Sequence, residues 1–357
     1  MASQEGHSEG LSTRDAAMVV PPESPPFRAG RFKGYQLVWR LLAAGHEVTI
    51  LNRGTHQDPF GHRVTRLRAD RTTSEFAEVL QGKDFDAVVD FAAYQAADAR
   101  EAVNVLRGQT DHYVFISSGA VYMVQEGASR PCTHPWSETD YTDQVSPAPD
   151  APGDFPSWRY GANKREAEAI LGEAWRLEHF PVTILRLPIV NGERDPDRRL
   201  ESYLWRILDG GPVLLPDGGT NLTRHVYSGE VAKAIVGLLG MKSTQGEVFN
   251  LSQEEQPSLL DLVQILAGLL GAPCRVQSVS AEALAQVGLA SRDISPFSGR
   301  WSSRLDPSRA TTMLDFHHQP LVQYLDKIVS AWMSYPPTTP PDDYRDRQKE
   351  LLVGMKQ

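Results

Sequence analysis

Short apolar runs alternate with amphipathic stretches along most of the chain after residue 34. The runs are rich in Val, Ile and Leu and predict buried strands at 47–51, 87–89, 113–116, 182–185 and 248–251. The stretches between them repeat apolar residues at helical spacing and predict helices at 35–45, 76–80, 99–106, 160–177 and 230–239. Strands and helices that alternate in this way predict a parallel sheet with right-handed crossover connections.

Both ends of the chain and one internal segment depart from this rhythm. Residues 1–29 are rich in Ser, Glu, Gly and Pro, which predicts a tail in which only Ala16 to Val20 could form a short strand. Residues 126–158 predict a long loop, whose aromatic side chains either cover a substrate or pin the loop to the body. The segment after Pro336 is polar and Pro-rich, and we expect a loose tail there.

Composition and charge narrow the class of function. The 357 residues are 41% hydrophobic and 23% charged, as in ordinary globular proteins, and the net charge of −9 argues against general attraction to nucleic acid or anionic membranes. Cys132 and Cys274 lack zinc-site spacing and the histidines lack ligand partners, so we expect no metal site. No run has the length of a membrane span and no secretory signal is evident, which predicts a cytoplasmic protein.

Tyr160 and Lys164 form the strongest chemical signal. They lie four residues apart on a predicted helix, about one turn from each other on the same face. An ammonium in that position favours phenolate and lowers the pKa of Tyr160, which would let the phenol act as an acid or base near neutral pH. Ser118 follows the strand at 113–116, and ligands of α/β sheets bind at the carboxyl ends of strands. Ser118 could therefore bond the same substrate oxygen as Tyr160.

Four further segments agree with this reading. They are Ala87–Ala93, Arg186–Gly192, Arg224–Ala232 and Asp306–Ala310. With Ser118, Tyr160 and Lys164, they resemble the extended and atypical short-chain dehydrogenase/reductase family over residues 30–330, a family that includes nucleotide-sugar epimerases and dehydratases. Asn191 replaces the tyrosine of the family's Arg-Pro-x-x-Val-Tyr-Gly pattern. The segments 52–54 and 90–94 are most similar to the atypical branch that contains chloroplast stem-loop RNA-binding proteins.

The resemblance implies a fold and its domains. We expect an α/β protein with a Rossmann-like doubly wound parallel sheet and a smaller C-terminal substrate lobe. The implied division is a tail at 1–29, a dinucleotide-binding domain at 30–185 that is rejoined by about 229–252, a substrate lobe at 186–228 and 253–334, and a tail at 335–357. The family also suggests a homodimer.

The resemblance further implies roles for individual residues. Ser118, Tyr160 and Lys164 would be catalytic, and Arg224 would meet a substrate phosphate, a role that a guanidinium suits. The implied cofactor-binding residues are Gly30, Gly34, Asn52, Arg53, Asp70, Phe91, Ala92, Ala93, Tyr160, Lys164 and Pro188. Asp70 matches the family's aspartate beside the adenine ring.

The phosphate-binding loop departs from the family pattern. A strand should run directly into Gly-x-x-Gly-x-x-Gly, whose glycines let the backbone approach a pyrophosphate at a helix N-terminus. Here the segment is 28–34, in which Gly34 matches the last glycine, Arg28 and Ala29 stand at or beside glycine positions, and Pro25-Pro26 precede it where the strand should be. Three explanations stay open. The loop could bind the diphosphate through Arg28, Arg31 or Lys33, the start of the sequence could be altered relative to its relatives, or cofactor binding could be lost.

A few positions in the sequence indicate which cofactor and which type of reaction to expect. No acidic residue lies within 50–54 and Arg53 could meet a 2′-phosphate, which favours NADP over NAD. Gly119 and Ala120 stand where sugar dehydratases carry an acidic pair, so dehydration is disfavoured. We therefore expect an NAD(P)-dependent epimerase or reductase that acts on a nucleotide sugar or a related small molecule. The alternative is a non-catalytic or RNA-handling binding protein on the same scaffold.

Overall fold

A seven-stranded parallel sheet forms the centre of the computed structural model, which describes residues 16–19, 30–55, 57–126, 134–150, 153–297, 304–344 and 346–356. In spatial order the strands are β10 (Val248–Asn250), β6 (Val182–Leu187), β5 (Tyr113–Ser118), β4 (Ala87–Asp90), β1 (Ala16–Val19), β2 (Val48–Asn52) and β3 (Thr65–Arg68). The chain changes direction across the sheet between β1 and β4, and ligands bind beside the carboxyl ends of strands at such a point. The predicted Rossmann-like sheet is confirmed.

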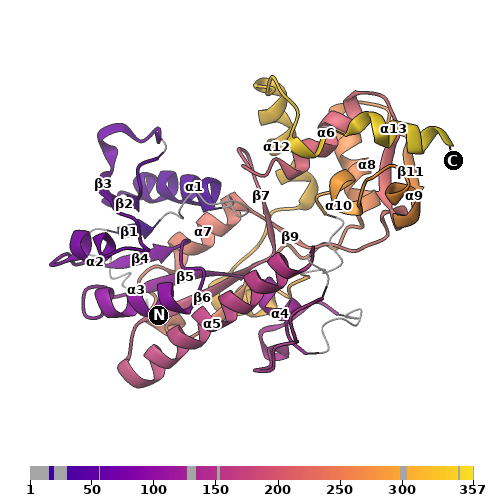
Figure 1. Cartoon of the computed structure of the whole chain (residues 1–357). Coiled ribbons are helices and arrows are strands. Elements are labelled where there is room, and N and C mark those ends of the chain that lie inside the picture. The colour runs from indigo at the N-terminus through magenta and orange to yellow at the C-terminus, as the bar shows by residue number, and fades with distance from the viewer. Residues whose placement is uncertain are drawn as a thin grey trace, which may run out of the picture.

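Helices cover both faces of this sheet (Figure 1). One face is covered by α1 (Gly30–Ala43) and α7 (Ser228–Leu238). The other face is covered by α3 (Ala96–Leu106) and α5 (Phe155–Glu178). The short helix α2 (Glu75–Leu80) contributes to the second face. Strand β5 sends alternate side chains into the two cores, Val114 into the first and Phe115 into the second. Burial on both faces explains why the strands are continuous apolar runs in the sequence.

A second, smaller lobe lies beside the sheet in Figure 1, as the family resemblance implied. Its core joins Leu204, Leu262 and Leu325 from the helices α6 (Arg199–Leu208), α8 (Leu259–Leu270) and α12 (Leu321–Ser334). The part of the chain after β6 also forms two pairs of parallel strands. They are β7 (Ile189–Asn191) with β9 (His225–Tyr227), and β8 (Val213–Pro216) with β11 (Val276–Val279). The shorter helices are α4 (Ala120–Met123), α9 (Ala281–Ala285), α10 (Ser291–Ile294) and α11 (Ser308–Leu314).

The N-terminal segment differs from the predicted tail. Residues 1–29 were expected to be a tail, with the first strand position taken by Pro25-Pro26, but Ala16–Val19 forms strand β1 between β2 and β4. Ala16 pairs in register with both Val48 and Ala87, so this strand is central to the sheet. The sequence allows a short strand at Ala16 to Val20, and this strand forms because it pairs with β2 on one side and β4 on the other. Pro25-Pro26 cannot take this place, because proline lacks the amide hydrogen that a central strand donates.

The C-terminal segment also differs from the expected loose tail. It contains the helix α13 (Arg347–Lys356), which packs on the second lobe. Glu350 is fully buried and pairs with both Arg347 and Arg206, and Val353 joins a small apolar core with Leu214. Buried ion pairs hold this helix in place. Its charged residues made the segment look like an exposed tail in the sequence, so the helix was not predicted.

The segment that was expected to be a loop at 126–158 ends earlier, because α5 begins at Phe155. Two aromatic side chains of this segment attach it to the body of the protein. Trp136 stacks on the buried Tyr122 with ring centroids 5.7 Å apart, and Tyr141 packs against the same cluster. Of the two interpretations left open for this loop, these contacts favour the structural one. None of the helices in the described part of the chain is both long and apolar enough to span a membrane.

Candidate active site

The carboxyl ends of β4, β5 and β6 bring the predicted catalytic residues to one edge of the sheet. Ser118 ends β5, and helix α5 carries Tyr160 and Lys164 along the same edge. Gly161 allows α5 to approach so closely, because a Cβ atom at this position would lie 2.5 Å from the carbonyl oxygen of Ala120. The helix that holds Tyr160 is therefore packed directly against the turn that follows Ser118.

Tyr160 and Ser118 are hydrogen-bonded to each other. Burial raises the pKa of the Tyr160 phenol above its ordinary value, and the bond with Ser118 acts in the opposite direction. The expectation that Lys164 would lower the pKa of Tyr160 is corrected here, because desolvation is the larger influence on the phenol. A raised pKa keeps the phenol protonated at neutral pH, which is the form that donates a proton.

Lys164 is almost completely buried, with 1% of its surface exposed. Its ammonium group donates to the carbonyl oxygen of Ala93 at 2.7 Å and to that of Ile116 at 2.8 Å. The aromatic rings of Tyr94 and Phe115 lie 4.9 and 4.6 Å from Nζ. Two carbonyl dipoles and two ring faces thus surround the cation, and Lys164 ties helix α5 to the ends of β4 and β5.

The turn after β4 is held by two carboxylates. Asp90 Oδ1 accepts the amide hydrogens of Ala92 and Ala93, and Asp98 Oδ2 accepts those of Tyr94 and Gln95. Asp90 itself is fully buried, pairs with Arg71 at 2.8 Å and accepts a hydrogen bond from Tyr113. Of the residues predicted to line a cofactor, Ala92 and Ala93 lie in this turn and are buried, as is the preceding Phe91.

The ends of β2 and β3 bring together the other predicted cofactor residues. Asn52 accepts hydrogen bonds from the amide of Gly54 and from Arg68, and Arg53 lies 3.7 Å from Asp70. Arg53 Nε is buried and has no hydrogen-bond partner among the described residues. Asp70 is about 30% exposed. This set of donors and acceptors fits the polar adenosine half of a dinucleotide. Arg68 was not predicted from the sequence, because its hydrogen bond to Asn52 joins β3 to β2 and depends on how the two strands pair.

The phosphate-binding loop can be described only at its end. Gly30 begins α1 and Gly34 is buried within it. Arg28 and Ala29 lie outside the described residues, as do the side chains of Arg31 and Lys33. The three explanations for the altered glycine pattern therefore stay open. Pro188, another predicted cofactor residue, is buried at the junction of β6 and β7.

Arg224 lies on the side of the second lobe. Its Nη1 donates to the carbonyl oxygen of Leu305 at 2.7 Å, and its Nε has no hydrogen-bond partner among the described residues. Burial lowers the pKa of Arg224; the neighbouring Arg304 acts in the same direction and Asp306 in the opposite one. Two neighbouring guanidinium groups favour an anion between them. Arg304 was not predicted, because only the fold brings residue 304 beside residue 224.

Asn191, which stands where the family has a tyrosine, bonds a histidine of the neighbouring strand β9. Its side-chain amide lies 2.9 Å from Nδ1 of the buried His225. If Asn191 donates through Nδ2, Nδ1 of His225 is the acceptor and Nε2 carries the ring proton. Burial lowers the pKa of His225 to about 3, so this ring is neutral. The pair joins β7 to β9 at the border of the two lobes.

A buried polar network lies beneath Ser118, and sequence reasoning missed it. Ser117 donates to Glu168 at 2.5 Å, and Glu168 forms a close ion pair with Arg186 at 2.6 Å. Arg186 also donates to the hydroxyl of Tyr122 at 2.7 Å. The signal was available in part, because Glu168 follows Tyr160 and Lys164 at the same four-residue spacing and so shares their helix face.

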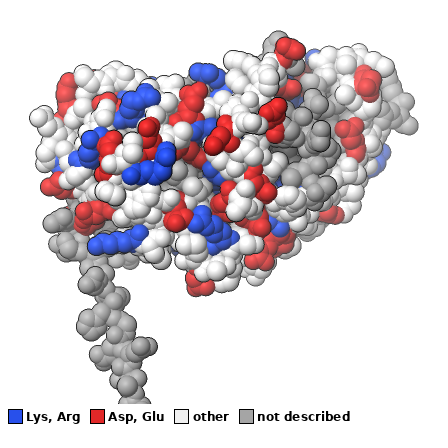
Figure 2. All heavy atoms as spheres, turned by 90° about the horizontal axis from the view of Figure 1, so that it is seen from below, with Lys and Arg blue, Asp and Glu red and all other residues white. Residues whose placement is uncertain are grey.

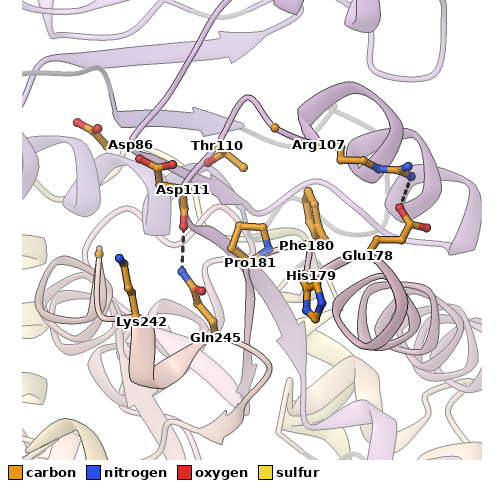
Figure 3. Close-up of a pocket in the computed structure, with 12 residues that line it drawn as sticks. Asp86, Arg107, Thr110, Asp111, Glu178, His179, Phe180, Pro181, Lys242 and Gln245 are labelled. Carbon is orange, nitrogen blue, oxygen red and sulfur yellow. Dashed lines mark hydrogen bonds and ion pairs between the residues drawn. The ribbon is translucent and has the colours of Figure 1, made fainter.

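A cavity of about 630 Å³ opens at the opposite edge of the sheet (Figure 3). It is lined by residues that precede β4, β5, β6 and β10, among them Asp86, Asp111, Pro181 and Gln245. It contains none of the predicted site residues. Because all strands of the main sheet are parallel, this cavity and the Ser118–Tyr160 pair lie at opposite ends of the strands. Among the described residues no group of three or more His, Cys, Asp or Glu side chains could hold a metal ion.

Comparison with solved structures supports the architecture. UDP-glucuronic acid 4-epimerase from Bacillus cereus, solved in complex with NAD, is 19% identical with a TM-score of 0.65, over 90% of this chain and 97% of that one. UDP-glucose 4-epimerase from Thermotoga maritima, solved with UDP-glucose, is 18% identical with a TM-score of 0.66, over 90% and 99%. At these identities the likeness establishes the fold.

Comparison of sequences establishes the family. The chain is 25% identical over 260 residues to the chloroplast stem-loop binding protein of 41 kDa b from Arabidopsis thaliana, an alignment that covers 68% of this chain and 62% of that protein's length. A model of the NAD dependent epimerase/dehydratase family matches residues 29–252, well over half of the chain. The protein therefore belongs to the NAD dependent epimerase/dehydratase family.

Proposed function

We propose that the protein is an NAD(P)-dependent epimerase or carbonyl reductase that acts on a secondary alcohol or carbonyl of a nucleotide sugar or a related small molecule. The observation that carries the proposal is the hydrogen bond between Tyr160 and Ser118 at the carboxyl edge of β5, with Lys164 anchored on the same helix. Ligands of this fold bind at that edge. The family, shown by the match over 29–252, makes hydride chemistry the expected use of such a pair.

Tyr160 is the acid/base of the proposed reaction. In the reducing direction the protonated phenol of Tyr160 donates a proton to the substrate carbonyl oxygen, and in the oxidising direction its phenolate takes the proton of the alcohol. The Ser118 hydroxyl bonds the same oxygen. Lys164 ties the same helix to the carbonyl oxygens of Ala93 and Ile116 and so fixes the position of Tyr160. The chemistry that a bound nicotinamide supplies is reversible hydride transfer. Gly119 and Ala120 cannot move a proton, so we favour epimerisation or reduction over dehydration.

The residues at β2 and β3 would hold the adenosine half of the cofactor. Within the described part of the chain Arg53 Nε has no hydrogen-bond partner, and the carboxylate of Asp70 is partly exposed, so together they suit ribose or adenine groups. The absence of an acidic residue in 50–54 favours the 2′-phosphate of NADP. The Bacillus cereus epimerase carries NAD, so both coenzymes belong in the test.

Arg224 and Arg304 would receive the phosphate of the substrate. The Nε atom of Arg224 is available for a further acceptor, and the neighbouring guanidinium of Arg304 adds a second positive charge. A diphosphate that links a sugar to a nucleoside matches this pair in charge. The solved Thermotoga maritima epimerase binds UDP-glucose, which makes that compound a suitable first substrate to test.

The test has two stages. Purified full-length protein is titrated with NADH and with NADPH while nicotinamide fluorescence is followed, and saturable binding of one of them is expected. UDP-glucose and UDP-glucuronic acid are then offered with the oxidised form of the preferred coenzyme, which accepts the hydride of the secondary alcohol, and conversion is followed by chromatography. Absence of saturable binding of either coenzyme would refute the proposed function.

RNA binding is the second candidate, and the name of the Arabidopsis relative favours it. The net charge of −9 acts against it, because RNA binding depends on clustered positive charge. On the face drawn in Figure 2, Lys and Arg are interspersed with Asp and Glu. A gel-shift titration with a stem-loop RNA in 150 mM salt distinguishes the two candidates, and we expect no shift at micromolar protein.

A further inference from the structure

Tyr94 packs against both Tyr160 and Lys164, the two residues of α5 that the proposed reaction uses. Its ring centroid is 6.3 Å from that of Tyr160, with the planes inclined at 54°, and Nζ of Lys164 lies 4.9 Å from the centre of the same ring. Tyr94 is half-buried, whereas Lys164 is 1% exposed. One aromatic side chain thus contacts both the cation and the phenol of the proposed reaction centre.

The backbone that carries Tyr94 is held rigidly in place. The amide hydrogens of four consecutive residues, 92–95, are all accepted by the carboxylates of Asp90 and Asp98. The carbonyl oxygen of Ala93, the residue before Tyr94, accepts the ammonium of Lys164. With both the preceding carbonyl and its own amide engaged, the Tyr94 ring has a defined position over Lys164.

The ring has two physical consequences at this place. Its face attracts the ammonium through the ring quadrupole, an interaction that strengthens when water is excluded. Its bulk takes up space beside Tyr160 that would otherwise hold water. Helix α5 carries Tyr160 and Lys164, and Tyr94 contacts both of them from the turn after β4.

We propose that Tyr94 is a positioning residue of the reaction centre: its ring forms an aromatic wall that shields the Lys164 ammonium from water and holds the Tyr160 phenol beside Ser118. This inference rests on the proposed function for its catalytic meaning, but the shielding itself is a property of the folded chain. The ring carries the effect, so Tyr94→Phe keeps the wall and Tyr94→Leu, of similar bulk, removes the aromatic face.

Shielding is tested without any enzymatic assay. Wild type, Tyr94→Phe and Tyr94→Leu are treated with acetic anhydride, and acetylation of Lys164 is followed by peptide mass spectrometry, with the exposed Lys242 as the internal reference. We expect Lys164 in Tyr94→Leu to react about tenfold faster relative to Lys242, the factor that corresponds to a cation–π contact of about 1.4 kcal/mol. Tyr94→Phe should stay within about twofold of wild type. Equal labelling in all three proteins would overturn the proposal.

Positioning is tested by separating chemistry from binding. With UDP-glucose and the preferred coenzyme, kcat of Tyr94→Leu should fall about tenfold while the Kd for reduced coenzyme stays within about twofold, and Tyr94→Phe should restore kcat. A Tyr94→Leu variant with unchanged kcat, or with a loss confined to coenzyme binding, would contradict the positioning role. If wild type shows no turnover, the proposed function fails, and the labelling result still decides whether Tyr94 shields Lys164.

Discussion

Glu168 of α5 and Arg186 of β6 form a buried ion pair directly beneath the candidate active site. Arg186 Nη2 lies 2.6 Å from Glu168 Oε2, and its Nε donates to both carboxylate oxygens. Because Glu168 also accepts the hydroxyl of Ser117, this pair links the helix of Tyr160 to the strand of Ser118.

Glu168→Gln is expected to destabilise the protein strongly. The change leaves the guanidinium of Arg186 buried without its counter-charge, and the loss should be about 3–5 kcal/mol. Urea unfolding followed by circular dichroism measures it. Glu166→Gln, the same change at an exposed position of the same helix, should stay within about 0.5 kcal/mol of wild type. Adding Arg186→Met to Glu168→Gln should recover part of the loss, and a double variant no more stable than the single one would argue against unpaired charge as the cause.

Gly161→Ala should reduce activity by pushing Tyr160 away from Ser118. The new Cβ atom would lie 2.5 Å from the carbonyl oxygen of Ala120 and 2.7 Å from Val124, so α5 must shift. We expect a loss of stability of about 1–3 kcal/mol and a decrease in kcat. Gly172→Ala is the matched control, because nothing lies within 4 Å of its added Cβ and alanine favours a helix. Equal activity in the two variants would show that the close approach at Gly161 does not position Tyr160.

Stability should decrease between pH 7 and pH 5. Burial lowers the pKa of His112 to about 4 and that of His225 to about 3, so the unfolded chain, whose histidines have pKa values near 6.5, takes up protons in this range that the folded protein does not. Stability therefore falls as the pH drops below about 6.5, by about 2 kcal/mol per histidine at pH 5. Urea unfolding at both pH values measures the decrease.

His112→Gln isolates one of the two contributions. His112 accepts the amide hydrogen of Gly240 at Nδ1 and therefore donates from Nε2 to Thr183. This residue lies away from the candidate active site, at the start of β5. The variant should lose the part of the pH-dependent decrease that His112 contributes, about 2 kcal/mol at pH 5, although its stability at pH 7 is lower than that of wild type. An undiminished decrease would mean that His112 is not buried as a neutral ring.

The sequence predicted those parts of the site that follow from local spacing. Tyr160 and Lys164 share a helix face because they are four residues apart, and Ser118 ends an apolar run that could only be a buried strand. The raised pKa of Tyr160 could not be predicted, because it comes from burial by the rest of the fold. The carbonyl partners of Lys164 lie in the turn after β4 and in β5, 71 and 48 residues before Lys164 in the chain.

The two ends of the chain were predicted less well, for two different reasons. At the N-terminus, the prolines after residue 20 marked the segment as irregular, and a strand as short as Ala16–Val19 is recognisable only by its pairing with β2 and β4. At the C-terminus, α13 is anchored by Arg347 and Glu350, which are typical of an exposed segment until their partner Arg206 is known.

Tyr160→Phe tests the central claim most directly, because it removes only the phenol oxygen that is proposed to exchange the proton. Turnover of UDP-glucose, or of whichever nucleotide sugar wild type converts, is compared with that of Tyr335→Phe, which makes the same change at an exposed position. We expect kcat of Tyr160→Phe to fall by at least about 100-fold, with coenzyme affinity and the urea midpoint unchanged. Near-normal turnover by Tyr160→Phe would contradict the assignment of Tyr160 as the acid/base.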